Sequence, residues 1–139
     1  MLKKRKSKLE RLREAAEAAT AEFDANRREL NAVIKRAKEL AKELRDPETP
    51  PARRMAIREE IRMLQVQEVE LRQREETLSQ KAMKATQRYR EAQRRLCEAQ
   101  RIINVIENPP PWGLGKYSPQ QIGEFKRKAE QTIQELTNV

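Results

Sequence analysis

The sequence predicts an all-α protein, built as a long antiparallel coiled-coil hairpin with a short third helix packed at the open end. Apolar residues recur at alternating steps of three and four along two long stretches, which is the repeat of supercoiled helices. Prolines gather in two clusters that interrupt these stretches, and proline ends or kinks a helix. Only three glycines occur in 139 residues, which excludes a fold rich in tight turns.

The first helix is expected over about residues 2–45, a stretch without proline or glycine. One narrow apolar seam follows it, and Asn26 is the only polar member of that seam. A single seam is enough for one main neighbouring helix. The seam residues are Leu9, Leu12, Ala16, Ala19, Phe23, Asn26, Leu30, Val33, Ala37, Leu40 and Leu44.

The second helix is expected over residues 51–107, after the break at residues 46–50. Its seam continues from Ile57 to Ile106, and Glu68 and Glu75 are the polar exceptions. Two carboxylates on one face can indicate acid chemistry or a metal site. The favoured interpretation is that each Glu stem lies along a shallow seam with its head in water, or that a polar layer sets the register. Thr49 and Asp46 are both candidate N-caps for this helix, and the sequence does not choose between them.

A loop at residues 108–118 and a helix from residue 119 to about residue 137 complete the chain. Ser118, Pro119 and Gln121 have the spacing of a capping box that begins with proline at the first helical position. The predicted organisation is therefore a hairpin over 1–107, the loop over 108–118 and a C-terminal helical segment over 119–139.

The short first break favours pairing of the first helix with the second within one chain. The expected register places Leu40 opposite Ile57, Ala19 opposite Leu78 and Leu12 opposite Ala85. A dimer or trimer that pairs the same seams between chains is the alternative.

The charge distribution adds a second feature to the hairpin. The chain holds 31 basic and 22 acidic residues, a net charge of +9, and no histidine. Residues 1–13 and 81–101, here called the basic region, meet at the open end in the predicted register and form a strongly basic pole. The candidate contacts for a polyanion such as DNA or RNA are Lys3, Lys4, Arg5, Lys6, Lys8, Lys81, Lys84, Arg88, Arg90, Arg94, Arg95 and Arg101.

The basic region has two interpretations. It can neutralise phosphates in a salt-dependent manner, or it can be the solvated outer face of long helices. Aromatic residues that would stack on bases are nearly absent from it, so reading of a base sequence is not expected.

Two further groups are candidates for protein docking. The loop holds Trp112, Leu114 and Tyr117 after three consecutive prolines, a run that favours extended polyproline II backbone. The favoured interpretation is nevertheless that Trp112 folds back onto Ile102, Ile103 and Ile106 and closes the end of the second helix, while the glycines permit the reversal of the chain. Met63, Val66 and Val69 form a small apolar row on the outer face of the second helix. This row can seat another helix, or its members can be isolated exposed apolar residues of the kind found on most protein surfaces.

These features predict a non-catalytic structural or assembly protein, a rod-like spacer or adaptor among other proteins, with sequence-independent nucleic-acid binding as the alternative function. An enzyme is not expected, because histidine, a Gly-rich phosphate loop and clustered thiols are missing. We expect no cofactor, no membrane span and no signal peptide. The expected location is the cytoplasm or the inside of a particle. The chain could also form homo-oligomers. The expected architecture is similar to internal bacteriophage proteins, type III export stalk proteins and the tRNA-binding arms of some synthetases, and no motif separates these groups.

Overall fold

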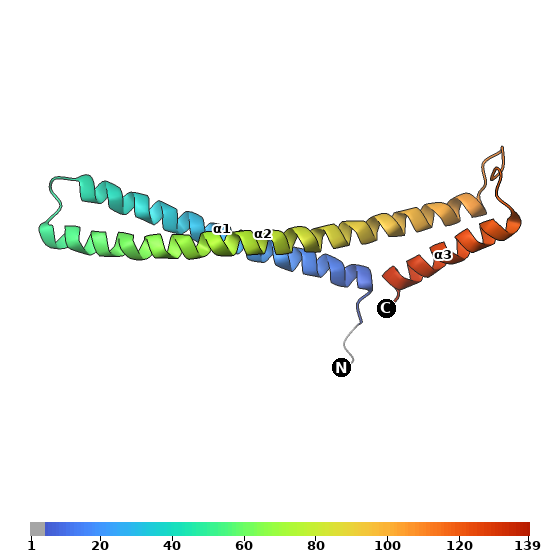
Figure 1. Ribbon diagram of the computed structural model, residues 1–139, viewed down its shortest axis with the longest axis horizontal. Coiled ribbons are helices and arrows are strands. Elements are labelled where there is room, and N and C mark those ends of the chain that lie inside the picture. Colours follow the sequence, from blue (N-terminus) through green and yellow to red (C-terminus); the bar gives the residue numbers. More distant parts are fainter. Residues whose placement is uncertain (1–4) are drawn as a thin grey trace. The chain divides into compact units, whose positions relative to one another are not determined.

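The computed structural model describes residues 5–139 and contains three helices (Figure 1). They are α1 (Lys8–Arg45), α2 (Pro51–Glu107) and α3 (Pro119–Thr137). The two long helices pack against each other and the third is short, which confirms the predicted helical hairpin. The predicted bounds of α2 and α3 and the predicted end of α1 are confirmed as well.

The predicted start of the first helix, near residue 2, is wrong for the residues that the structure describes. Residues 5–7 are not helical, and α1 begins at Lys8. The Ser7 hydroxyl accepts a hydrogen bond of 3.1 Å from the backbone amide of Glu10, and Ser7 is buried. A serine in this position satisfies one of the free amides at a helix N-terminus. The helix therefore starts where the cap is.

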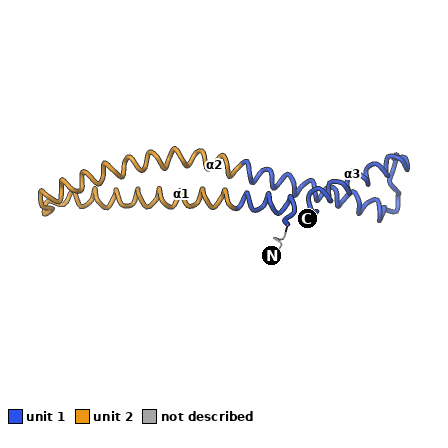
Figure 2. The backbone as a smooth tube through the Cα atoms, turned by 90° about the horizontal axis from the view of Figure 1, so that it is seen from below, with its two compact units in different colours: residues 1–17, 84–139 blue, residues 18–83 orange. Residues whose placement is uncertain are grey.

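The chain forms two compact units (Figure 2). Unit 1 comprises residues 1–17 and 84–139, and unit 2 comprises residues 18–83. Both units contain a segment of α1 and a segment of α2, and unit 1 also contains α3.

In unit 2 the two helices run antiparallel and bury the predicted seam between them. Leu40 and Ile57 are both fully buried, and they are the pair that the predicted register places opposite each other. The side-chain amide of Asn26 donates a hydrogen bond of 3.0 Å to the carbonyl of Leu71. Arg36 pairs with Glu60 across the helices at 3.2 Å. These contacts confirm the register within this unit.

The turn at residues 46–50 is held by side chains at the adjoining helix ends. The Thr49 hydroxyl donates a hydrogen bond of 2.7 Å to the Glu43 carbonyl, so it caps the end of α1. Asp46 accepts a hydrogen bond from the Glu48 amide. Neither side chain therefore caps the start of α2, the role for which the sequence offered both.

Arg53 and Glu43 join the two helices next to this turn. The guanidinium donates two hydrogen bonds, of 2.8 and 3.1 Å, to the two carboxylate oxygens. This contact lowers the pKa of Glu43 and raises that of Arg53, in both cases chiefly through the hydrogen bond between them. A bidentate pair of this kind fixes direction as well as distance.

In unit 1, α3 packs against α2 and the first turns of α1. Leu136 is fully buried, and Ala129 of α3 and Ala92 and Ala99 of α2 are also buried. Glu135 accepts a hydrogen bond of 3.0 Å from the Lys8 ammonium group and lies 3.6 Å from the Arg95 guanidinium. One carboxylate of α3 thus contacts both other helices of this unit. The hydrogen bond from Lys8 is the largest cause of the lowered pKa of Glu135.

Candidate functional site

The loop between α2 and α3 turns sharply at its prolines. The Gly113 amide donates a hydrogen bond of 2.9 Å to the Pro110 carbonyl, which closes a β-turn with Pro111 and Trp112 at its centre. Proline suits the second position of such a turn. Gly113 and Gly115 follow with φ angles of 80° and 71°, a backbone region that other residues rarely adopt. The chain therefore bends at this point, and the extended run expected from the three prolines does not continue through Trp112.

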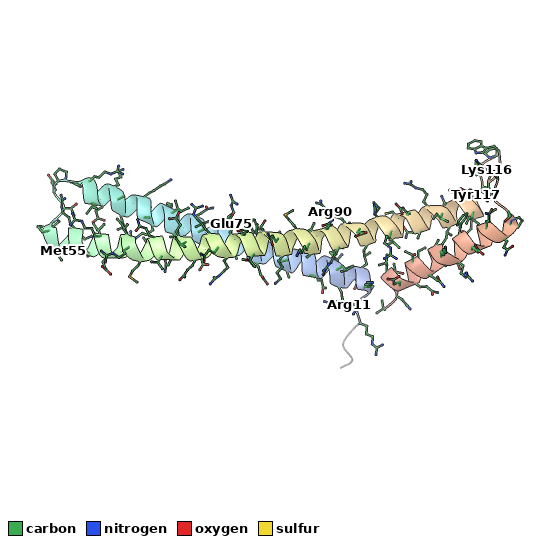
Figure 3. All side chains as sticks on the ribbon, in the orientation of Figure 1. Arg11, Met55, Glu75, Arg90, Lys116 and Tyr117 are labelled. Atoms are coloured by element: carbon green, nitrogen blue, oxygen red, sulfur yellow. The ribbon has the colours of Figure 1, made fainter. Side chains whose placement is uncertain are left out.

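The turn places Trp112 at the tip of the loop, where its side chain is 85% exposed. The favoured expectation, that this indole packs on the isoleucines of α2, is therefore wrong, because the β-turn directs the side chain into solvent. Tyr117 is 55% exposed, and its ring meets that of Phe125 edge to face, with centroids 5.2 Å apart. Lys116 and Tyr117 lie together in the loop (Figure 3). Leu114 is half-buried.

An apolar groove of about 620 Å³ lies between this loop, the end of α2 and the start of α3. Arg101 is its only charged lining residue. Trp112, Leu114 and Tyr117, the three loop residues that the sequence singled out, all contribute to its wall. The other lining residues are Ile102, Val105, Ile106, Pro110, Gly113, Gly115, Ile122 and Phe125.

The groove exists because the end of α2 has only one helical neighbour in unit 1. The start of α1 shares a cavity with Arg88, Ala92 and Arg95 of α2, and the later turns of α2 extend beyond it toward the loop (Figure 1). Ile102 and Val105 form a second apolar row there, and each remains 41% exposed. One helix and a loop do not cover so wide an apolar face.

The groove residues contributed by α2 and α3 were not predicted to belong to a docking surface. The sequence does contain an indication of this surface. Val105 and Ile106 lie three and four positions after Ile102, so the three side chains share one helix face. Ile122 and Phe125 lie three positions apart on α3 and also share one helix face. The seam alone did not indicate that α2 carries more apolar surface near its end than one neighbouring helix can bury.

Unit 1 contains most of the predicted polyanion contacts. The described members are all exposed: Arg5, Lys6, Lys8, Lys84, Arg88, Arg90, Arg94, Arg95 and Arg101. Lys81 belongs to unit 2, where it pairs with Glu22 at 3.3 Å. Lys3 and Lys4 lie outside the described residues. The residues 1–17 and 84–139 of unit 1 hold 17 basic and 9 acidic side chains, so the basic excess of the chain lies almost wholly in this unit.

These cations differ in their ion pairing. Lys6 pairs with Glu14 at 2.6 Å, and Lys8 and Arg95 share Glu135. Among residues 5–139, no carboxylate oxygen lies within 4.0 Å of the side-chain nitrogens of Arg88, Arg90, Arg94 or Arg101. Arg90, Arg94 and Arg101 are spaced to share the face of α2 opposite its seam, and Figure 3 shows Arg90 on the side of α2 away from the start of α1. Their charge is available to a ligand.

The predicted apolar row of unit 2 is exposed to solvent. Met63, Val66 and Val69 are 61, 58 and 57% exposed. Met55, nearer the turn, is also exposed (Figure 3). Nothing within this unit covers the row, so it is a second candidate docking surface.

The two seam carboxylates take part in ion pairs. Arg27 donates a hydrogen bond of 2.8 Å to Glu75, across the helices. Glu68 pairs with Arg72 on its own helix at 2.9 Å. No group of three or more His, Cys, Asp or Glu side chains within residues 5–139 has the arrangement of a metal site.

No helix within residues 5–139 is both long enough and apolar enough to cross a membrane. In the comparisons with known proteins, no family model, no curated protein and no solved structure matches this chain.

Proposed function

We propose that the chain is a non-catalytic structural or assembly protein, a helical-hairpin spacer or adaptor that binds other proteins of a larger complex. The observation that carries the proposal is the exposure of Trp112. Tryptophan is the residue type most enriched at the energetic centres of protein interfaces. Here it stands at a loop tip beside an apolar groove, where burial of the indole by a partner removes a large apolar surface from water.

The exposed row of Met63, Val66 and Val69 supports the same proposal independently. It belongs to unit 2, whereas Trp112 belongs to unit 1. Two separate apolar surfaces suit a protein that contacts more than one neighbour in an assembly. Both are too exposed to contribute much to the stability of the isolated chain, so partner burial accounts for them best.

Site-specific photocrosslinking in the source cells tests this proposal. A photoreactive residue is introduced at Trp112, at Val66 and at the exposed control position Gln80. The proposal predicts discrete protein adducts at one or both apolar positions and none at Gln80. Adducts at neither apolar position, or the same diffuse adducts at all three, would contradict it.

Sequence-independent nucleic-acid binding is a second candidate function. The specific observation that favours it is a set of exposed arginines on α2 that pair with no carboxylate in the described part of the chain: Arg88, Arg90, Arg94 and Arg101. Arginine forms bidentate contacts with phosphate. Such binding falls steeply as the salt concentration rises, because each neutralised phosphate releases counterions.

The test is a fluorescence-anisotropy titration with a random DNA duplex at about 50 and about 200 mM salt. The triple variant Arg90→Gln, Arg94→Gln, Arg101→Gln should bind more weakly, with a log–log salt slope shallower by about 0.9 for each phosphate that is no longer neutralised. The matched control removes the same charge from unit 2 through Arg28→Gln, Arg58→Gln and Arg74→Gln. Equal weakening in both variants, or no binding at low salt, would reject this candidate.

A further inference from the structure

The groove beside Trp112 has an apolar lining, and three basic residues that line it or adjoin its lining residues in the chain are here called its basic rim. Arg101 lines it, and Lys116 lies in the loop between two lining residues, Gly115 and Tyr117. Lys126 directly follows the lining residue Phe125. Within residues 5–139, none of these three cations has a carboxylate within 4.0 Å. Residues 101–128, which include all lining residues of the groove, hold five basic and two acidic side chains, so the segment that forms the groove has a local excess of positive charge.

The groove continues along the interface of α2 and α3. A neighbouring hollow shares Ile102 and Phe125 with it, and is also lined by Lys128, Arg95 and Glu98. Glu98 is the one carboxylate along the wall. The two hollows together are lined mainly by apolar side chains, and their charged lining residues are three basic and one acidic: Arg95, Arg101, Lys128 and Glu98.

We infer that this groove binds an acidic segment of a partner protein whose large apolar side chains enter the groove while its carboxylates meet the basic rim. The inference rests on the proposed adaptor function and names the chemistry of one of its partners. Charge complementarity selects the acidic segment, because a basic segment would leave the rim cations facing like charge.

The shape of the groove favours a protein segment over other ligands of the same charge. A small molecule needs most of its surface buried, whereas this groove is open to solvent along one side. A membrane surface could take up the protruding Trp112, but it would leave the hollow lined by Ile102, Ile106 and Phe125 unfilled. A hollow receives side chains from a partner. Apolar side chains at helical or extended spacing meet that requirement.

Peptide selection on the full chain tests the inference. A displayed library of random peptides is selected against the wild-type chain and counter-selected against Trp112→Ala. The variant should fold normally, since the indole is 85% exposed, and circular dichroism checks this. The enriched peptides should combine a net negative charge with at least two large apolar residues.

One enriched peptide without tryptophan is then titrated into the protein. Trp112 is the only tryptophan of the chain, so its emission reports directly on the groove and should shift to the blue. Trp112→Ala should weaken binding by roughly tenfold or more, as is typical of a tryptophan at the centre of an interface. Lys116→Gln with Lys126→Gln should weaken it by about threefold or more and make it less salt-sensitive. The matched control Lys35→Gln with Lys38→Gln should bind as the wild type does.

Three results would overturn the inference: no enrichment over Trp112→Ala, enrichment of neutral or basic peptides, or a blue shift produced by anionic lipid vesicles but by no acidic peptide. These results leave the adaptor function standing if crosslinking at Val66 still yields a discrete partner. If neither the crosslinking nor the peptide selection gives the expected result, both the adaptor function and the binding of an acidic segment in the groove are rejected.

Discussion

Asn26 donates a hydrogen bond of 3.0 Å from its side-chain amide to the backbone carbonyl of Leu71, and this bond joins α1 to α2 inside the seam of unit 2. Asn26 is 5% exposed, and among residues 5–139 its side-chain oxygen has no hydrogen-bond partner. A buried acceptor without a partner costs stability. A single polar residue in a coiled-coil seam is also a means of fixing the register. Asn26 therefore favours one pairing of the helices at a cost in free energy.

The first prediction is that Asn26→Leu raises the free energy of unfolding by about 1 kcal/mol or more, because it removes the unpaired buried oxygen and adds apolar burial. The Leu71 carbonyl still accepts its intrahelical hydrogen bond after the change. Urea unfolding followed by circular dichroism measures the effect.

Chromatography coupled to light scattering should at the same time show more self-association of Asn26→Leu, because the register is less restricted. A variant that is less stable and strictly monomeric would show that the hydrogen bond outweighs the unpaired oxygen.

The second prediction concerns Leu40, which is fully buried opposite the equally buried Ile57. Leu40→Ala should lower the free energy of unfolding by about 2–5 kcal/mol, the range for a large-to-small change in a packed core. Met63→Ala is the matched control, since Met63 is 61% exposed, and its effect should stay within about 0.5 kcal/mol. Chemical denaturation of both variants makes the comparison. Similar losses of stability in the two would mean that the seam is not packed as described.

The seam was predictable from the sequence because, in a pair of helices, the apolar residues that recur every three or four positions are the ones that face the partner helix and become buried. All seam residues from Leu9 to Leu44 and from Ile57 to Ile106 are buried or half-buried, Glu68 and Glu75 included. Helix ends were predictable where a proline or a capping box marks them. The start of α1 was missed although Ser7 and Glu10 have capping-box spacing, because the apolar and basic residues before them also suit a helix.

The candidate binding surfaces were only partly predictable. The sequence singled out Trp112, Leu114 and Tyr117 by composition, but the exposure of Trp112 depends on the β-turn that the Pro110–Gly113 hydrogen bond closes. Pairing partners of charged residues were harder still. Glu135 contacts Lys8 from 127 positions away in the chain, and only the packing of α3 brings the two together.

The third prediction tests the cap of α3. The Ser118 hydroxyl accepts a hydrogen bond of 3.2 Å from the Gln121 amide, and the Gln121 side chain accepts one of 2.9 Å from the Ser118 amide. Ser118→Ala should cost about 1 kcal/mol. Hydrogen exchange should show reduced protection in the first turns of α3, with no change around Leu40. A uniform reduction of protection across the chain would contradict a local role for this cap.

The fourth prediction concerns pH and Glu135, whose pKa is lowered from its usual 4.5 chiefly by the hydrogen bond from Lys8 and further by the charges of Lys8 and Arg95. The ionised form is thus the one that the folded state favours. Its contribution to stability is fully present above pH 4.5 and is lost as the pH falls through the lowered pKa. Glu135→Gln should therefore be less stable than the wild type near neutral pH, and the two stabilities should converge in acid.

Unfolding free energies of both proteins measured against pH make this test, and the neutral-pH difference should shrink in high salt because the ion pairs are exposed. Glu43, whose pKa is also lowered, contributes equally to both proteins and cancels from the difference. The matched control Glu130→Gln removes an exposed carboxylate of α3 that pairs with none of residues 5–139, and its difference from the wild type should not depend on pH in this way. A Glu135→Gln difference that persists in acid would mean that Glu135 holds α3 through packing of its stem and not through its charge.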